Sequence, residues 1–96
     1  MGPKTEKLIK VLDQLVEILN IDNDLHWKNW FKQANEKLMS SDFSGIEKVL
    51  SAYGGMGSFN DFYLGDEASS KKKFNKLRAE AWRLAKDIKH EYETHT

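Results

Sequence analysis

The residues best suited to nucleophilic chemistry lie in a glycine-rich stretch near the middle of the chain. Ser58 follows Gly57 and stands three positions before Asp61, so that a hydroxyl and a carboxylate occur close together. A serine nucleophile also needs a base and an oxyanion hole, and the Gly-x-Ser-x-Gly turn that exposes such a serine has a glycine two places after it. Asn60 occupies that place here. We therefore expect no catalytic serine, and no enzyme.

Phosphate and metal sites are also not expected. The glycines within 54–57 suggest a phosphate-binding loop, but neither the P-loop nor the dinucleotide-binding pattern is present. Both motifs follow a strand, whereas the segment before these glycines is predicted to be a helix. His90 and His95 are five residues apart, whereas metal ligands on a helix usually lie three or four apart. The chain has no cysteine, which excludes a disulfide scaffold and thiolate ligands. The sequence thus predicts no cofactor and no metal.

The same stretch is better suited to contact with another protein. Residues 54–67 contain aromatic and acidic side chains and no lysine or arginine. Aromatic residues dominate binding hot spots, and acidic groups steer a basic partner towards the surface. A structural role is the alternative for Asn60 and Asp61, since their side chains can close a turn by hydrogen bonding to the backbone. We expect the following residues to contact a partner: Asn60, Asp61, Tyr63, Asp66 and Glu67.

The charges elsewhere give little reason to expect nucleic acid or membrane as a partner. Fifteen basic residues balance fifteen acidic ones, so the chain has no strong overall field. Lys71–Lys73 form the one lysine run, at the start of a predicted helix where positive charge opposes the helix dipole. This run is either a solvated helix start or a contact for an acidic partner. No apolar run could span a bilayer and no export signal is visible, which favours a cytoplasmic location.

Helical elements must position these residues. The chain of 96 residues is long enough to form one core without disulfides, and we expect a single all-α domain over residues 1–96. Bundle packing is expected, with an ordered glycine-rich loop between the third and fourth helices. Apolar residues recurring three and four positions apart predict helices over about 4–20, 24–39, 44–53 and 70–93.

Several local signals define these helices further. Ser44 and Glu47 match a Ser-x-x-Glu capping box at the start of the third helix, and Gly54 follows its end. Trp82 lies at the margin of the apolar stripe of the last helix, and a partly exposed tryptophan would mark an interface. Other aromatic residues are expected in the core, among them Trp27, Trp30, Phe31, Phe74 and Tyr92.

Residues 50–62, which read Leu-Ser-Ala-Tyr-Gly-Gly-Met-Gly-Ser-Phe-Asn-Asp-Phe, resemble a family of small uncharacterised bacterial proteins. That family shares a Gly-Gly-Met-Gly-Ser core followed by Phe or Leu and then Asn-Asp, and its members are all-helical. The resemblance implies a bacterial cytoplasmic protein and supplies no catalytic role for Ser58, Asn60 or Asp61. A looser resemblance to the immunity proteins of polymorphic toxin systems implies a toxin domain as the partner.

Two hypotheses of different kinds follow. The first is a non-catalytic helical module that binds another protein, most concretely an immunity protein that occupies the active surface of a toxin. The alternative is a small homo-oligomeric structural protein, a homodimer being the simplest case. Eight aliphatic residues within 8–19 exceed what one helix face needs, which favours some burial between chains.

Overall fold

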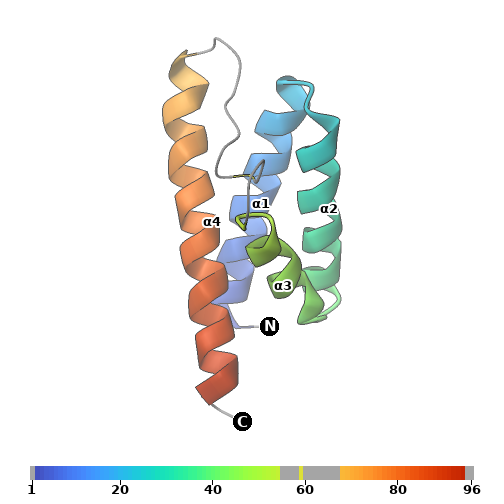
Figure 1. Cartoon of the computed structure of the whole chain (residues 1–96), viewed down its shortest axis with the longest axis vertical. Helices are drawn as coiled ribbons and strands as arrows, with labels where there is room; N and C mark the ends of the chain where they lie inside the picture. The colour runs from blue at the N-terminus through green and yellow to red at the C-terminus, as the bar shows by residue number, and fades with distance from the viewer. Residues whose placement is uncertain (1, 55–58, 60–67, 95–96) are drawn as a thin grey trace.

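The computed structural model describes residues 2–54, 59 and 68–94, and all regular structure in this part of the chain is α-helical. α1 runs antiparallel to both α2 and α4, and the short α3 crosses between α2 and α4 (Figure 1). The predicted all-α class and its four helices are confirmed. Their bounds are α1 (Pro3–Ile21), α2 (Leu25–Met39), α3 (Ser44–Ser51) and α4 (Ala68–Thr94).

Local signals set both ends of α1 and the start of α2. Pro3 stands in the first turn of α1, where its missing N–H is not needed. After α1 the chain turns through Asn23, whose φ of 64° lies in the left-handed region that asparagine tolerates. The Asp24 carboxylate then accepts a hydrogen bond from the Trp27 N–H at 2.9 Å and caps α2.

α3 begins in a different way from the predicted capping box. Its N-cap residue is Phe43, which provides no side-chain hydrogen bond, and the Ser44 N–H donates to Asp42 Oδ1 at 2.9 Å. The Ser44–Glu47 capping box is therefore wrong, because the Asp42 carboxylate takes the role predicted for the serine hydroxyl. Hydrogen bonds from the Ser44 hydroxyl and N–H hold the pKa of Asp42 below its ordinary value. The helix also ends earlier than predicted, at Ser51.

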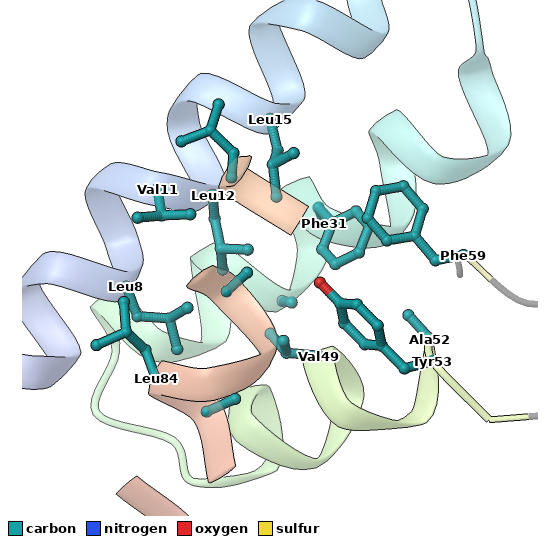
Figure 2. Packing of buried hydrophobic residues seen from close by; sticks show 14 of the residues in the cluster. Leu8, Val11, Leu12, Leu15, Phe31, Val49, Ala52, Tyr53, Phe59 and Leu84 are labelled. Atoms are coloured by element: carbon teal, nitrogen blue, oxygen red, sulfur yellow. The ribbon is translucent and has the colours of Figure 1, made fainter. Parts of the chain in front are cut away.

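α1 supplies the largest share of the aliphatic core, and Figure 2 shows several of its leucines pointing into the packed interior. The surplus aliphatic residues Ile9, Val16 and Ile18 are half-buried and pack against the same core. The broad apolar stripe of α1 is thus covered in part by the chain itself. The buried residues of α1 are Leu8, Val11, Leu12, Leu15 and Leu19.

The C-terminal end of α4 departs from the prediction. Tyr92, expected in the core, is 54% exposed and stacks on Phe43 with ring centroids 4.3 Å apart. The reason is that α4 extends beyond the ends of α2 and α3, so that its last turns have little core to cover (Figure 1). Among the described residues, none of the helices combines the length and the apolar character that a bilayer crossing requires.

α3 is too short to close the core along its whole length. At 1.5 Å per residue its eight residues span about 12 Å, against about 28 Å for α1. Near the start of α2 the remaining gap towards α4 is filled by Phe59, which has no exposed surface. The glycine-rich stretch therefore returns to the core at Phe59, as an anchored loop requires.

One polar side chain, Asn35 of α2, is buried among the described residues. Its Nδ2 donates to Asp13 Oδ1 at 2.7 Å and lies 3.5 Å from the Ile9 carbonyl oxygen, which joins α2 to α1. Its Oδ1 is buried without a hydrogen-bond partner. A flipped amide would place this oxygen against two other oxygens, so the orientation is fixed by the neighbours.

We expect Asn35→Leu to leave the free energy of unfolding unchanged or to raise it by up to about 1 kcal/mol. The substitution removes the unsatisfied oxygen, and the exposed Asp13 carboxylate can bond to water instead. Asn35→Asp, the matched variant, places a buried carboxylate beside Asp13 and should lower stability by about 2 kcal/mol or more. Urea unfolding measures both. A loss of about 2 kcal/mol in Asn35→Leu would show instead that the amide hydrogen bond stabilises the α1–α2 packing.

Candidate functional site

The residues predicted to contact a partner lie outside the part of the chain that the structure describes: Asn60, Asp61, Tyr63, Asp66 and Glu67. Ser58, the serine weighed for catalysis, lies outside it as well. The described residue next to the predicted contacts is Phe59, which immediately precedes Asn60. The surroundings of Phe59 therefore fix the point from which the predicted contact segment begins.

Phe59 is enclosed by aromatic rings from several elements. Its ring centroid lies 4.6 Å from that of Phe31 and 5.2 Å from that of Trp27, both on α2. The ring centroid of Phe74 on α4 lies 5.5 Å away. Tyr53, which follows α3, lies 5.6 Å away with its plane at 85° to that of Phe59. Figure 2 shows Phe59 beside Phe31 and Tyr53. Edge-to-face ring pairs add to the stabilisation from apolar burial, so Phe59 joins α2, α3 and α4.

The backbone of Phe59 is held by hydrogen bonds on both sides. Its N–H donates to the Ala52 carbonyl at 2.7 Å, and its own carbonyl accepts from Arg78 Nη1 at 3.0 Å. The Tyr53 hydroxyl donates to the Arg78 carbonyl at 2.8 Å. Burial raises the pKa of Tyr53 well above its ordinary value, which keeps the donating proton on the hydroxyl. The chain thus starts towards Asn60 from a fixed point.

Arg78 of α4 is the cation that completes this arrangement. Its Nη2 donates to Asn75 Oδ1 at 2.7 Å, and its guanidinium carbon lies 5.1 Å from the ring centroid of Phe74 and 5.8 Å from that of Phe59. The forked donors and the cation–π contacts together restrain the guanidinium. No pattern in the sequence distinguishes Arg78 from a surface arginine, because its partner carbonyl comes from a segment distant along the chain.

The remaining residues considered for chemistry lie apart from this cluster or outside the described residues. His90 is exposed on α4, and His95 is not among the described residues. Lys71–Lys73 are exposed in the first turns of α4, which agrees both with a solvated helix start and with a contact for an acidic partner. In residues 2–54, 59 and 68–94 no three histidine, cysteine or carboxylate side chains are grouped as a metal ion would need.

Trp82 forms a second candidate surface. Trp27 and Trp30 are half-buried, and the Trp30 indole N–H donates to the Lys48 carbonyl at 2.9 Å. Trp82 is 40% exposed, and the Lys86 ammonium lies 4.3 Å from its ring centroid. Of the three tryptophans, Trp82 therefore leaves the most surface that a partner could cover. Beside it lies a surface groove of about 440 Å³, lined by Leu50, Trp82, Lys86, Lys89, His90 and Glu93.

Comparison with known families matches residues 21–71 to a domain of unknown function, DUF6966. The matched segment contains α2, α3 and the glycine-rich stretch, and with them Trp27, Phe31, Tyr53 and Phe59. No curated protein and no solved structure matches the chain. Because the matched segment makes up more than half of the 96 residues, the chain belongs to the DUF6966 family, a domain of unknown function.

Proposed function

We propose that the protein is a non-catalytic helical module that binds another protein. Its most concrete form is a bacterial cytoplasmic immunity protein that covers the active surface of a toxin. The observation that carries the proposal is the anchoring of Phe59, whose ring is fully buried and whose backbone is hydrogen bonded on both sides. A contact segment that starts from a rigid point loses less conformational entropy on binding. Such binding requires shape and charge and no chemistry.

The charge of the proposed contact segment indicates the kind of partner. Residues 60–67 contain three acidic side chains and no basic one. An acidic segment accelerates association with a basic surface and disfavours acidic competitors. We propose as contacts Asn60 and Asp61, which directly follow Phe59, together with Asp66 and Glu67. The ring of Tyr63 is proposed to insert into the surface of the partner.

We expect the tagged full-length chain to retain a stoichiometric protein partner from its source cells, and Asp61→Lys to lose it. Reversing one charge at the centre of a contact should weaken binding by about tenfold or more. Glu6→Lys, an equal charge change on the exposed first turn of α1, is the matched control and should retain the partner. Affinity capture with quantitative mass spectrometry measures this, and circular dichroism verifies that both variants are folded.

Equal recovery of the partner by Asp61→Lys would contradict the proposed contact segment. Recovery of the chain's own copies alone would instead favour the homo-oligomeric structural protein. The aliphatic residues Ile9, Val16 and Ile18 of α1, which pack against the chain's own core and are half-buried, are where a second copy would make contact in that case.

A further inference from the structure

Two acidic residues of α4 are paired with lysines of α1. On the flank towards α1, Glu80 Oε1 lies 3.9 Å from Lys7 Nζ of α1. Glu91 accepts a hydrogen bond from the Lys4 ammonium of α1. These pairs satisfy the acidic residues within the chain. The flank of α4 towards α3 carries Trp82 and two lysines.

On the flank towards α3, Trp82, Lys86 and Lys89 follow one another at spacings of four and three, which places them on one face of the helix. Lys89 also reaches Glu47 of α3 at 3.4 Å. The half-buried Leu50 of α3 contributes an apolar wall to the groove of about 440 Å³ that these residues line. This groove, the α3–α4 groove, thus combines apolar surface with the ammonium groups of Lys86 and Lys89 and the carboxylate of Glu93.

Trp82 has a hydrogen-bonding capacity that the described part of the chain does not use. Its indole N–H makes no hydrogen bond there, whereas that of Trp30 donates to a backbone carbonyl. An indole N–H is only a donor, and the neighbouring Lys86 ammonium is also only a donor. A carboxylate is the side-chain group that accepts from both and also neutralises the lysine charge.

We propose that the α3–α4 groove binds an acidic segment of a partner protein, with an apolar side chain against Leu50 and Trp82 and a carboxylate on Lys86. A nucleic acid fits less well, because Lys89 is already paired with Glu47, which leaves Lys86 as the one other lysine among the lining residues, whereas a phosphate backbone is held by several basic side chains. This inference rests on the proposed function, that the chain binds another protein. It does not rest on residues 60–67.

Selection of random peptides displayed on phage against the immobilised full chain tests the inference without a known partner. The enriched peptides should combine aspartate or glutamate with a large apolar residue. A labelled consensus peptide should bind Lys86→Glu about tenfold more weakly than the wild type, and should bind Trp82→Ser more weakly still. Lys10→Glu, the same charge change on the exposed face of α1, should bind within about twofold of the wild type.

A second readout places the peptide in the groove. In two-dimensional NMR of the full chain, the indole N–H signal of Trp82, assigned by its loss in Trp82→Phe, should move on titration with the peptide. Enrichment of basic peptides, no enrichment, or an unmoved Trp82 signal would overturn the inference. Tighter binding of a single-stranded oligothymidylate, dependent on Lys86, would replace the protein partner by nucleic acid. Peptides lost in Asp61→Lys but kept in Lys86→Glu would overturn the groove and leave the proposed function standing.

Discussion

Phe59→Ala is expected to lower the free energy of unfolding by about 4 kcal/mol. The ring is fully buried between Trp27 and Phe31 of α2 and Phe74 of α4, so its removal leaves a cavity that α3 is too short to fill. For a domain of this size, stability is about 5–15 kcal/mol, and a loss of this magnitude lowers the melting temperature by about 15–30 °C. Thermal and urea unfolding measure the loss.

Two comparison variants separate the role of Phe59 from the loss of any aromatic ring. Phe59→Leu keeps most of the apolar volume and should cost about 1 kcal/mol. Tyr92→Ala removes a ring that is 54% exposed, and should also cost about 1 kcal/mol or less. If Phe59→Ala were no more destabilising than Tyr92→Ala, the glycine-rich stretch would not close the core. Phe59→Ala should also speed hydrogen exchange at the residue 59 amide, which donates to Ala52.

Substitutions at Phe59 and Asp61 should weaken partner binding for two different reasons. Phe59→Ala should weaken binding by releasing the segment that follows it, and this loss should be accompanied by lower stability. Asp61→Lys should weaken binding with the Phe59 ring cluster intact and with little change in melting temperature. A binding loss in both variants with a stability loss only in Phe59→Ala is the pattern that a pre-positioned contact segment predicts.

The helices could be predicted from the sequence because their signals are local. The spacing of apolar residues along α1 already identifies its buried face, and an aromatic residue between glycines indicates a loop that must return to the core. The start of α3 at residue 44 was predicted correctly, but its cap was not. Asp42 and Ser44 are both residue types that cap helices, and spacing alone does not decide which oxygen accepts from the free N–H groups.

Non-local features could not be predicted in this way. Arg78 acquires its role from the carbonyl of Phe59, nineteen positions earlier, and only the folded chain brings the two together. Periodicity placed Trp82 at the margin of the buried stripe of α4, but its exposure depends on where α3 crosses. The groove beside it exists because Leu50 of α3 and Lys86 of α4 meet there, which no spacing within one helix reports.

Gly45→Val is expected to cause the second-largest loss, about 3 kcal/mol. Gly45 is buried in the first turn of α3, and a Cβ added there would lie 2.9 Å from the Ala34 carbonyl oxygen and 2.9 Å from Leu38 Cγ. The leucine can shift, but the carbonyl belongs to the backbone of α2 and cannot. The absence of a side chain at Gly45 therefore sets the distance between α2 and α3.

The matched control is Gly54→Ala, because a Cβ at Gly54 meets no atom of residues 2–54, 59 and 68–94 within 4 Å, and the substitution should be neutral or slightly stabilising. Gly45→Ala should fall between the two, since a gain in helix propensity of up to about 1 kcal/mol opposes the contact with Ala34. Urea unfolding ranks the three variants, and a Gly45→Val loss no larger than that of Gly54→Ala would exclude the close approach of α2 and α3.

Displacing α3 should also disturb Phe59, because α3 leads directly to the Ala52 carbonyl and the Tyr53 ring that hold it. The losses of Gly45→Val and Phe59→Ala should then not be independent, and the double variant should lose about 1 kcal/mol less than the sum of the two single losses. Full additivity would mean that Phe59 is held by α2 and α4 alone. Coupling would mean that the spacing of α2 and α3 positions the proposed contact segment.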